Sequence, residues 1–438
     1  MDNKAIVWFR NDLRIHDNEA LTEALVKKAL VFPVYVFDER IFFGKTSYGF
    51  LKTGKFRAKF ILESVEDLRN NLRNLGSDLI VRIGKPEEEI FSLAKSLKTS
   101  WVYCNRERTS EEVEVQDSLE KKLWTIGQEL RYTRGKMLYY TSDLPFPINQ
   151  APDTFTIFRK EVERLVPVRL PLPSPKKMQH FGPFPEVGTI PDFSFFNSET
   201  FNENHVENIN FRGGESKALN QLDYFLQNNT KIVQYNERRQ ELFGWDFSSK
   251  LSPWLSTGCL SPKLVYCRLK EHERTYGESK SSYGLFVELL GRDFFRLIGK
   301  KYGSRIFKTS GLQNIKRSKD HDFGNSKCWF DAKTNIDIVD ACLIQLKETG
   351  YLSFKGRQLV SSYLVNDLQS DWLLGAEFFE SLLLDYDPCS NYGNWNQMAG
   401  IGHRLKDDRF LNPETQVKKL DPHGFFVKYW LKHRNSDT

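Results

Sequence analysis

The first part of the chain alternates short apolar runs with segments whose apolar residues recur at helical spacing. Four runs rich in valine, isoleucine and aromatic residues predict strands buried on both faces, at 5–9, 31–37, 79–83 and 101–104. Between them, helical spacing predicts amphipathic helices at 18–28, 56–75 and 86–97. Strands that alternate with helices favour a doubly wound parallel sheet, which we expect to end near residue 135. No G-x-G-x-x-G fingerprint for a dinucleotide accompanies these strands.

The pattern changes twice after this sheet. Residues 166–212 include seven prolines between Pro167 and Pro191, which predicts a long irregular connection. From Glu215 onward helical spacing dominates, and Glu288 and Arg292 in one predicted helix form a favourable i,i+4 ion pair. We therefore predict an α/β domain at 1–135, a linker at 136–212 and an all-helical domain at 213–438.

Composition and charge narrow the class of protein. The chain has 438 residues, of which 40% are hydrophobic and 27% charged, as expected of a folded protein with two or three domains. No apolar run is long enough to span a bilayer, and the N-terminus leads directly into a strand, so we expect no cleaved signal, no membrane partner and a cytoplasmic location. The six cysteines form no C-x-x-C pair and no metal-type spacing, which indicates buried side chains and no metal site.

Several ordered stretches carry a resemblance to a known family. Residues 7–18 read VWFRNDLRIHDN, residues 248–262 read SSKLSPWLSTGCLSP, and residues 385–395 read DYDPCSNYGNW. Further matching stretches lie at 152–160, 356–358 and 412–422. Together they resemble the photolyase/cryptochrome superfamily, most closely its cryptochrome-DASH branch, over nearly the whole chain. The resemblance implies an α/β domain followed by an all-helical domain that binds FAD.

The resemblance assigns an FAD site to the second half of the chain. Its members are Tyr235, Ser248, Ser249, Lys250, Leu251, Ser252, Glu288, Arg292, Arg357, Asp367, Asp385, Asp387 and Asn391. The three serines adjoin the start of a predicted helix, where hydroxyl and backbone N–H groups attract phosphate. Simple N-capping explains one serine there, but not three. Asn391 matches the position that faces flavin N5, where a neutral amide both donates and accepts hydrogen bonds.

The resemblance also implies an electron-transfer chain of three tryptophans. Trp395 lies beside the flavin in this reading, Trp372 comes next and Trp329 lies towards the surface. Core packing is the alternative for any one of the nine tryptophans, but all three match family positions. With Glu288, which handles a proton in repair enzymes of the family, and Asn391, these tryptophans are the candidate catalytic residues.

The sequence departs from the family where repair enzymes hold a cyclobutane pyrimidine dimer between two aromatic rings. Gly291 and Gln397 occupy the positions of those rings, and Phe354 replaces an asparagine that touches the lesion. Losing two stacking platforms costs about 2–6 kcal/mol of binding free energy. We therefore favour a blue-light photoreceptor of cryptochrome-DASH type. The alternatives are a light-driven lyase that repairs such dimers in single-stranded DNA, which Glu288 and Asn391 favour, and a DNA-binding flavoprotein without photochemical output.

Partners are less sharply indicated. A net charge of +6 permits a polyanion, and the basic runs at 316–319 and 403–409 would flank the site, so DNA, preferably single-stranded, is an expected partner. A folate antenna (5,10-methenyltetrahydrofolate) is a further expectation, with Glu111 as its acidic contact; a solvated helix face is the other reading of Glu111. We expect a monomer with a signalling partner that the sequence does not identify.

Overall fold

A five-stranded parallel sheet forms the first part of the chain in the computed structural model, which describes residues 3–27, 29–196, 211–315, 323–403 and 410–433. The strands are β1 (Lys4–Phe9), β2 (Leu30–Asp38), β3 (Ile80–Gly84), β4 (Trp101–Asn105) and β5 (Glu129–Thr133), in the order β3-β2-β1-β4-β5. Every neighbouring pair is parallel. The connecting helices are α1 (Glu19–Val26), α2 (Glu39–Phe42), α3 (Lys55–Asn74), α4 (Pro86–Leu97) and α5 (Ser110–Trp124).

Alternate residues of the strands face two different cores. On β1, Ile6 and Trp8 belong to a smaller core that α4 and α5 cover with Ile90 and Leu119. The intervening residues of β1, among them Val7, belong to a larger core that continues without a break into the second half of the chain. Because side chains alternate along a strand, one face of the sheet packs on α4 and α5, and the other shares its core with α1, α3 and the helical part.

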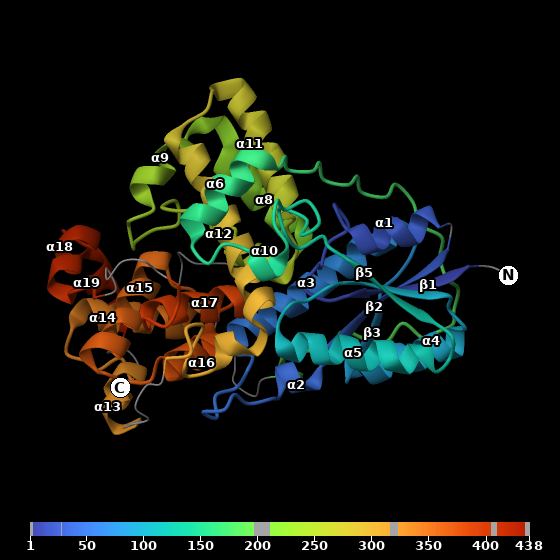
Figure 1. The fold of residues 1–438 in the computed structure, drawn as a ribbon, viewed down its shortest axis with the longest axis horizontal. Coiled ribbons are helices and arrows are strands. Elements are labelled where there is room, and N and C mark those ends of the chain that lie inside the picture. The colour runs from blue at the N-terminus through green and yellow to red at the C-terminus, as the bar shows by residue number, and fades with distance from the viewer. Residues whose placement is uncertain (1–2, 28, 197–210, 316–322, 404–409, 434–438) are drawn as a thin grey trace.

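The second half of the chain is helical throughout the residues described. After α6 (Phe155–Leu165) and α7 (Phe193–Phe196), its main helices are α8 (Glu215–Leu226), α9 (Lys231–Arg238), α10 (Ser252–Thr257), α11 (Pro262–Tyr276), α12 (Lys280–Tyr302), α13 (Phe323–Phe330), α14 (Asp337–Thr349), α15 (Phe354–Ser362), α16 (Trp372–Leu382), α17 (Pro388–Met398), α18 (Pro413–Leu420) and α19 (Phe425–His433). The sheet and helices α13 to α19 lie at opposite ends of the molecule (Figure 1).

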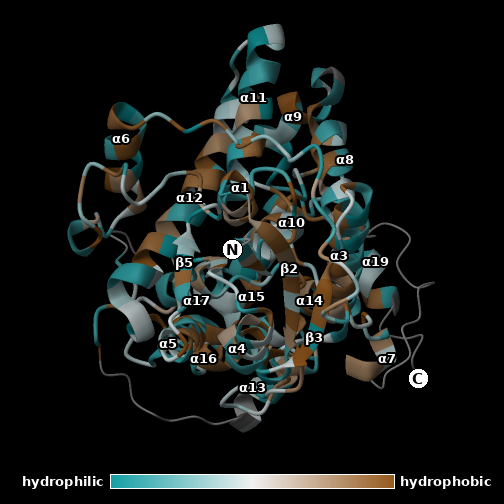
Figure 2. Cartoon of the chain, turned by 90° about the vertical axis from the view of Figure 1, so that its right-hand side faces the viewer, coloured by the Kyte–Doolittle hydropathy of each residue, from teal (hydrophilic) through white to brown (hydrophobic). Residues whose placement is uncertain are grey.

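These elements confirm the predicted fold class, a doubly wound parallel-sheet domain followed by an all-helical one. The division at residues 135 and 212 stays a prediction. Strand β5 was not predicted as an individual strand. Figure 2 shows β2 and β3 mostly in the hydrophobic colour, whereas the outer helix α11 is largely hydrophilic. Within the residues described, no helix is both long and apolar enough to cross a membrane.

The loop that follows β1 joins the two parts of the chain. The Arg14 guanidinium donates to the carbonyl oxygens of Gly135 and Gly258, at 2.7 and 2.8 Å. Asp17 forms a buried ion pair with Lys263 at 2.8 Å, and His16 contacts Glu215 at the start of α8. A side chain at Gly258 would collide with the backbone of this loop, and its φ of +72° also favours glycine. The motif at residues 7–18 therefore holds the sheet and the helical part of the chain together.

Candidate cofactor site

A buried ion pair connects α15 with the segment that precedes α17. The Arg357 Nη2 atom donates to both carboxylate oxygens of Asp385, at 2.9 and 2.7 Å, and Arg357 Nε donates to the Leu352 carbonyl at 2.8 Å. The Asp385 side chain is only 3% exposed, whereas that of Arg357 is 25% exposed. Burying such a pair costs desolvation energy, so its presence indicates a demand for charge at this point. The structure thus brings together two residues that the sequence assigned to one site.

Lys250 lies close to this pair and has an unusual environment. Its ammonium group is buried against the rings of Phe247, at 3.2 Å from the ring centre, and Tyr351, at 4.7 Å. Burial, reinforced by the Arg357 guanidinium, holds the pKa of Lys250 well below its ordinary value. In the part of the chain that the structure describes, its Nζ atom has no hydrogen-bond partner. A buried cation without a hydrogen-bonding partner is costly unless a ligand supplies one.

The donor set around Lys250 fits the group that the resemblance implies. FAD carries two phosphates, and an unsatisfied buried ammonium is a group that would hold them. Ser248 and Ser249 lie in the loop before Lys250, and Ser248 contacts the hydroxyl of Tyr351. Lys250 itself has a φ of +57°, a backbone conformation that its neighbours must maintain. The residues present therefore fit FAD on the chemistry of their donors.

A second buried network reaches from this site to the sheet. The Arg296 guanidinium, on α12, donates to Asp387 at 2.8 Å and to Glu107 at 3.0 Å, and Lys136 donates to Glu107 at 2.7 Å. All four side chains are at most 7% exposed. Asp387 also caps α17 by accepting from the Ser390 N–H at 2.9 Å. Despite burial, the pKa values of Glu107 and Asp387 are lowered, because the neighbouring cations favour their charged forms.

The predicted pair between Glu288 and Arg292 is wrong. Arg292 donates instead to the carbonyl oxygens of Lys136 and Leu255, at 2.6 and 2.8 Å. Glu288 forms its ion pair with Arg239 at 3.1 Å. Each side chain has its partners outside α12, and an i,i+4 pair on a helix contributes only about 0.2–0.5 kcal/mol to hold the two together. Desolvation raises the pKa of Glu288, but the side chain is 56% exposed, so solvent limits this rise, and the Arg239 guanidinium opposes it.

The departures from the family pattern leave an opening beside Glu288. No atom outside the local helix lies within 4 Å of the position that a Cβ would take at Gly291. Phe354 is 55% exposed, so its ring is not packed into the core. The backbone and the Cγ atom of Gln397 lie against Gly402. The position of the first aromatic platform is therefore open.

The three predicted redox tryptophans lie in the core of the helical part. The Asn391 amide donates to the Ala376 carbonyl at 2.9 Å, which fixes its orientation on α17. Trp395, Trp372 and Trp329 are 2%, 1% and 0% exposed. The expectation that Trp329 lies towards the surface therefore does not hold in this structure. Its indole N–H is satisfied inside the core by the Val360 carbonyl at 2.9 Å.

The remaining predicted residues are dispersed around these groups. Tyr235 is buried on α9, where burial raises the pKa of its hydroxyl, and Leu251 is buried just before α10. Ser252 begins α10 and is exposed. Asp367 ends a short π-helical segment, Tyr363–Asp367, and burial raises the pKa of its carboxyl. Glu111 is exposed and pairs with Lys52 at 2.6 Å. In the two basic runs, Lys316, Arg317, Lys319, Arg404, Lys406 and Arg409 lie outside the described residues.

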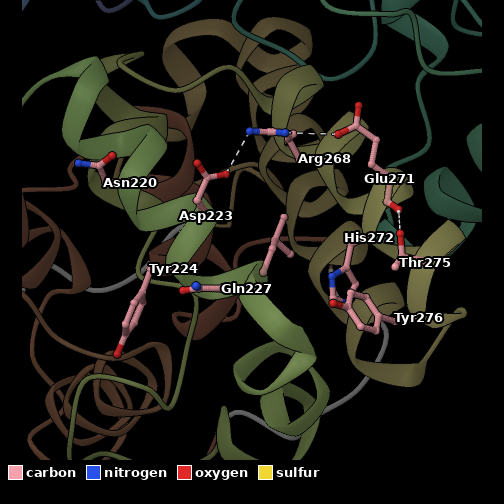
Figure 3. Close-up of a pocket in the computed structure, with 10 residues that line it drawn as sticks. Asn220, Asp223, Tyr224, Gln227, Arg268, Glu271, His272, Thr275 and Tyr276 are labelled. Atoms are coloured by element: carbon pink, nitrogen blue, oxygen red, sulfur yellow. Dashed lines mark hydrogen bonds and ion pairs between the residues drawn. The ribbon is translucent and has the colours of Figure 1, made fainter.

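A groove of about 650 Å³ between α8 and α11 is distinct from this site (Figure 3). Arg268 projects into it but already pairs with Asp223 at 3.2 Å and with Glu271 at 3.5 Å. No residue that the sequence assigned to the cofactor lines the groove. The groove is therefore not part of the candidate cofactor site.

Comparisons with known proteins agree with the residues described above. A family model described as DNA photolyase matches residues 5–176, and one described as the FAD binding domain of DNA photolyase matches residues 285–436. The chain is 42% identical to the cryptochrome DASH of Gloeobacter violaceus over 97% of this chain and 85% of that protein. It superposes on the crystal structure of a Synechocystis cryptochrome with a TM-score of 0.94 at 38% identity, over 99% and 89% of the two chains. A class III photolyase from Agrobacterium tumefaciens gives 0.86 at 26% identity, over 99% and 87%.

Proposed function

The chain belongs to the cryptochrome DASH branch of the photolyase/cryptochrome family, and on that premise we propose that it is a blue-light-responsive flavoprotein, photoreduced through its own tryptophans. FAD is its cofactor. When bound, FAD supplies a centre that absorbs blue light and accepts an electron. The chain's own residues must then hold the cofactor, supply that electron and keep water away from the path.

The observation that supports this proposal is the set of buried aromatic rings around α16 and α17, the helix that carries Asn391. The Trp395 ring meets Phe379 at 5.1 Å between ring centres, and Phe379 stacks on Trp329 at 6.4 Å. Trp372 begins α16, the helix that also carries Phe379, and α16 packs on α17. Gly375 on α16 lies against the Trp395 ring, and a side chain there would collide with the indole. Close packing of this kind keeps the rings at short separations in a medium that excludes water.

The charged residues of the site support the same proposal. The Arg357–Asp385 pair would present a fixed dipole to a flavin ring that gains charge on reduction. The unsatisfied Lys250 amine would donate to the phosphates, whose negative charge would favour its protonated form. The side-chain amide of Asn391 is neutral, and its nitrogen donates to the Ala376 carbonyl. The oxygen of the same amide can act as an acceptor. These residues bind and orient the cofactor, whereas the tryptophans supply the electron.

The test is photoreduction of the purified holoprotein under blue light with an external donor, followed by flavin absorbance. Trp395→Phe should slow photoreduction severely while the FAD content stays at the wild-type level. Trp124→Phe is the matched control, because Trp124 is 70% exposed at the end of α5 and should leave the rate unchanged. Unchanged photoreduction in Trp395→Phe would exclude the proposed path.

A second candidate function is light-driven repair of cyclobutane pyrimidine dimers, preferably in single-stranded DNA. Glu288 favours it, because a carboxyl with a raised pKa is suited to hold or deliver a proton. The opening at Gly291 leaves room for a flipped base but offers no ring to stack on it. Repair should be assayed with photoreduced protein on single- and double-stranded thymine-dimer oligonucleotides. Repair of either substrate would make the protein a lyase, and its absence in a photoactive sample would leave the photoreceptor.

Location, antenna and assembly complete the proposal. We place the protein in the cytoplasm as a monomer with DNA, preferably single-stranded, as its nucleic-acid partner. A folate antenna would have to displace Lys52 from Glu111, because the two already form an ion pair. Absorbance of the purified protein beyond its flavin bands would reveal such an antenna.

A further inference from the structure

A tyrosine and a glutamate form a hydrogen-bonded pair inside the aromatic core. The Tyr392 hydroxyl, on α17, donates to Glu380 Oε2, on α16, at 2.8 Å. Both residues are buried, at 5% and 9% exposed. The Tyr386 hydroxyl also bonds to Glu380, and the Arg57 guanidinium covers the Tyr386 ring at 4.7 Å from its centre. Nothing in the assigned cofactor site or tryptophan chain uses this pair.

The position of Tyr392 connects it to the tryptophan chain. Its ring meets that of Trp372 edge-on, with 6.3 Å between ring centres. On α17 it directly follows Asn391 and precedes Trp395 by three residues. Phe307 packs on its other side at 4.6 Å, which keeps water away from the ring. An oxidised indole at Trp372 would therefore have a phenol as its neighbour.

The protonation of the pair favours a coupled transfer of electron and proton. Burial and the Glu380 carboxylate together raise the pKa of the Tyr392 hydroxyl, so the neutral phenol is the resting form. A phenol that loses an electron becomes a strong acid and must release its proton. Burial also raises the pKa of Glu380, which makes its carboxylate a better proton acceptor. The hydrogen bond places that acceptor 2.8 Å from the proton's oxygen.

We propose that Tyr392 and Glu380 form a proton-coupled redox station for the tryptophan chain, an inference that rests on the proposed function. Light-excited oxidised flavin is the oxidant that withdraws one electron from the chain. One electron then passes from Tyr392 to the indole cation of Trp372, and one proton passes from Tyr392 Oη to Glu380 Oε2. The products are a restored Trp372, a neutral tyrosyl radical and a neutral Glu380 carboxylic acid. Return of the same electron from the reduced flavin to Tyr392, and of the proton from Glu380 Oε2 to Tyr392 Oη, would reset the pair.

The experiment is time-resolved electron paramagnetic resonance of the holoprotein after a blue flash, with and without ring-deuterated tyrosine. In the wild type we expect a tryptophan radical followed by a tyrosyl radical whose spectrum narrows on deuteration. Tyr392→Phe should lose the tyrosyl signal and prolong the tryptophan signal. Glu380→Gln keeps an acceptor oxygen for the hydroxyl but not a proton acceptor, so it should do the same. Tyr132→Phe is the control, because Tyr132 on β5 also bonds to a glutamate, Glu120, at 3.2 Å but lies in the sheet.

The outcomes distinguish a failure of the proposed function from a failure of the role proposed for Tyr392 and Glu380. If the wild type shows neither a tryptophan radical nor flavin photoreduction, the proposed function itself fails. If a tryptophan radical forms without a tyrosyl radical, or the tyrosyl radical persists in Tyr392→Phe, the function stands and the redox station is refuted. Should Glu380→Gln not fold, the wild type in heavy water serves instead. Coupled transfer requires slower tyrosyl formation there, and an unchanged rate would overturn the role of Glu380.

Discussion

Replacing Gly291 with tryptophan should restore dimer binding without disturbing the cofactor site. Gly291 lies on α12 between Glu288 and Arg292, and the space around its Cβ position is open to 4 Å. Its backbone does not have the positive φ that would demand glycine. The substitution therefore adds a ring on the open side of the helix, whereas Arg292 keeps its bond to the Lys136 carbonyl and Arg296 its bond to Asp387.

The substitution changes two free energies, that of dimer binding and that of folding. A ring stacked on a base contributes about 1–3 kcal/mol, which corresponds to roughly 5- to 150-fold tighter binding. Removing glycine from the interior of a helix also stabilises the folded protein by about 0.5–1 kcal/mol. Gly291→Ala provides this second contribution without the ring. The difference between the two variants is therefore the contribution of stacking.

The assay compares the wild type, Gly291→Ala and Gly291→Trp for binding to a single-stranded oligonucleotide with and without a thymine dimer, in the dark and at fixed salt. We expect Gly291→Trp to bind the dimer at least fivefold more tightly than Gly291→Ala, with equal affinity for undamaged DNA. Unfolding of each variant in urea, with its FAD content, shows whether the fold is intact. Equal dimer affinity in two folded, FAD-containing variants would refute the assignment of Gly291 to the lesion side of the site.

Three further predictions test the buried charges. Lys250→Met should lower the affinity for FAD. Without FAD, the free energy of unfolding of this variant should equal or exceed that of the wild type, because the substitution removes an unsatisfied buried amine. A lower free energy of unfolding would mean that Lys250 serves the fold. Arg296→Met leaves buried Asp387 without its ion-pair partner and Glu107 with Lys136 alone, and it should cost about 3–5 kcal/mol in urea unfolding, whereas a loss below 1 kcal/mol would contradict the network. Asp293, on α12, is buried and accepts from the N–H groups of Leu138 and Tyr139. Burial raises the pKa of Asp293 to about 6, so the folded protein binds this proton more tightly than the unfolded chain, and stability from this group falls as pH rises from about 4 to about 6. The wild type should therefore lose about 2 kcal/mol relative to Asp293→Asn between pH 4 and pH 7, and a constant difference would contradict the shift.

The sequence was sufficient to predict those strands of the sheet that are buried on both faces. The segments β1 and β2 are nearly continuous apolar runs, and their pattern admits few other structures. Strand β5 reads Glu-Leu-Arg-Tyr-Thr at the edge of the sheet, where one side faces solvent, so no apolar run marks it. Periodicity detects burial, and an edge strand is only partly buried.

For the buried charged residues, the sequence alone predicted less. The Arg357–Asp385 pair was assigned to one site through resemblance, because each residue stands in an ordered motif. Arg296 and Glu107 were not, although both are more deeply buried. Glu107 stands in a charged run that resembles a solvated helix face, and its partner lies 189 residues away. Tyr392 and Glu380 were missed for the same reason, because only packing brings α16 and α17 together.

Helix α12 explains how the cofactor side of the site can remain intact while the lesion side loses its rings. Arg292 and Arg296 are four residues apart, so they share one face of the helix and reach the backbone of Lys136 and the carboxylates of Glu107 and Asp387. Gly291 projects where no atom stands within 4 Å. A ring at residue 291 would therefore add no contact to the charged face, and its absence removes none. Dimer stacking at this position and the buried charge network are thus independent, which is why Gly291→Trp tests the first without altering the second.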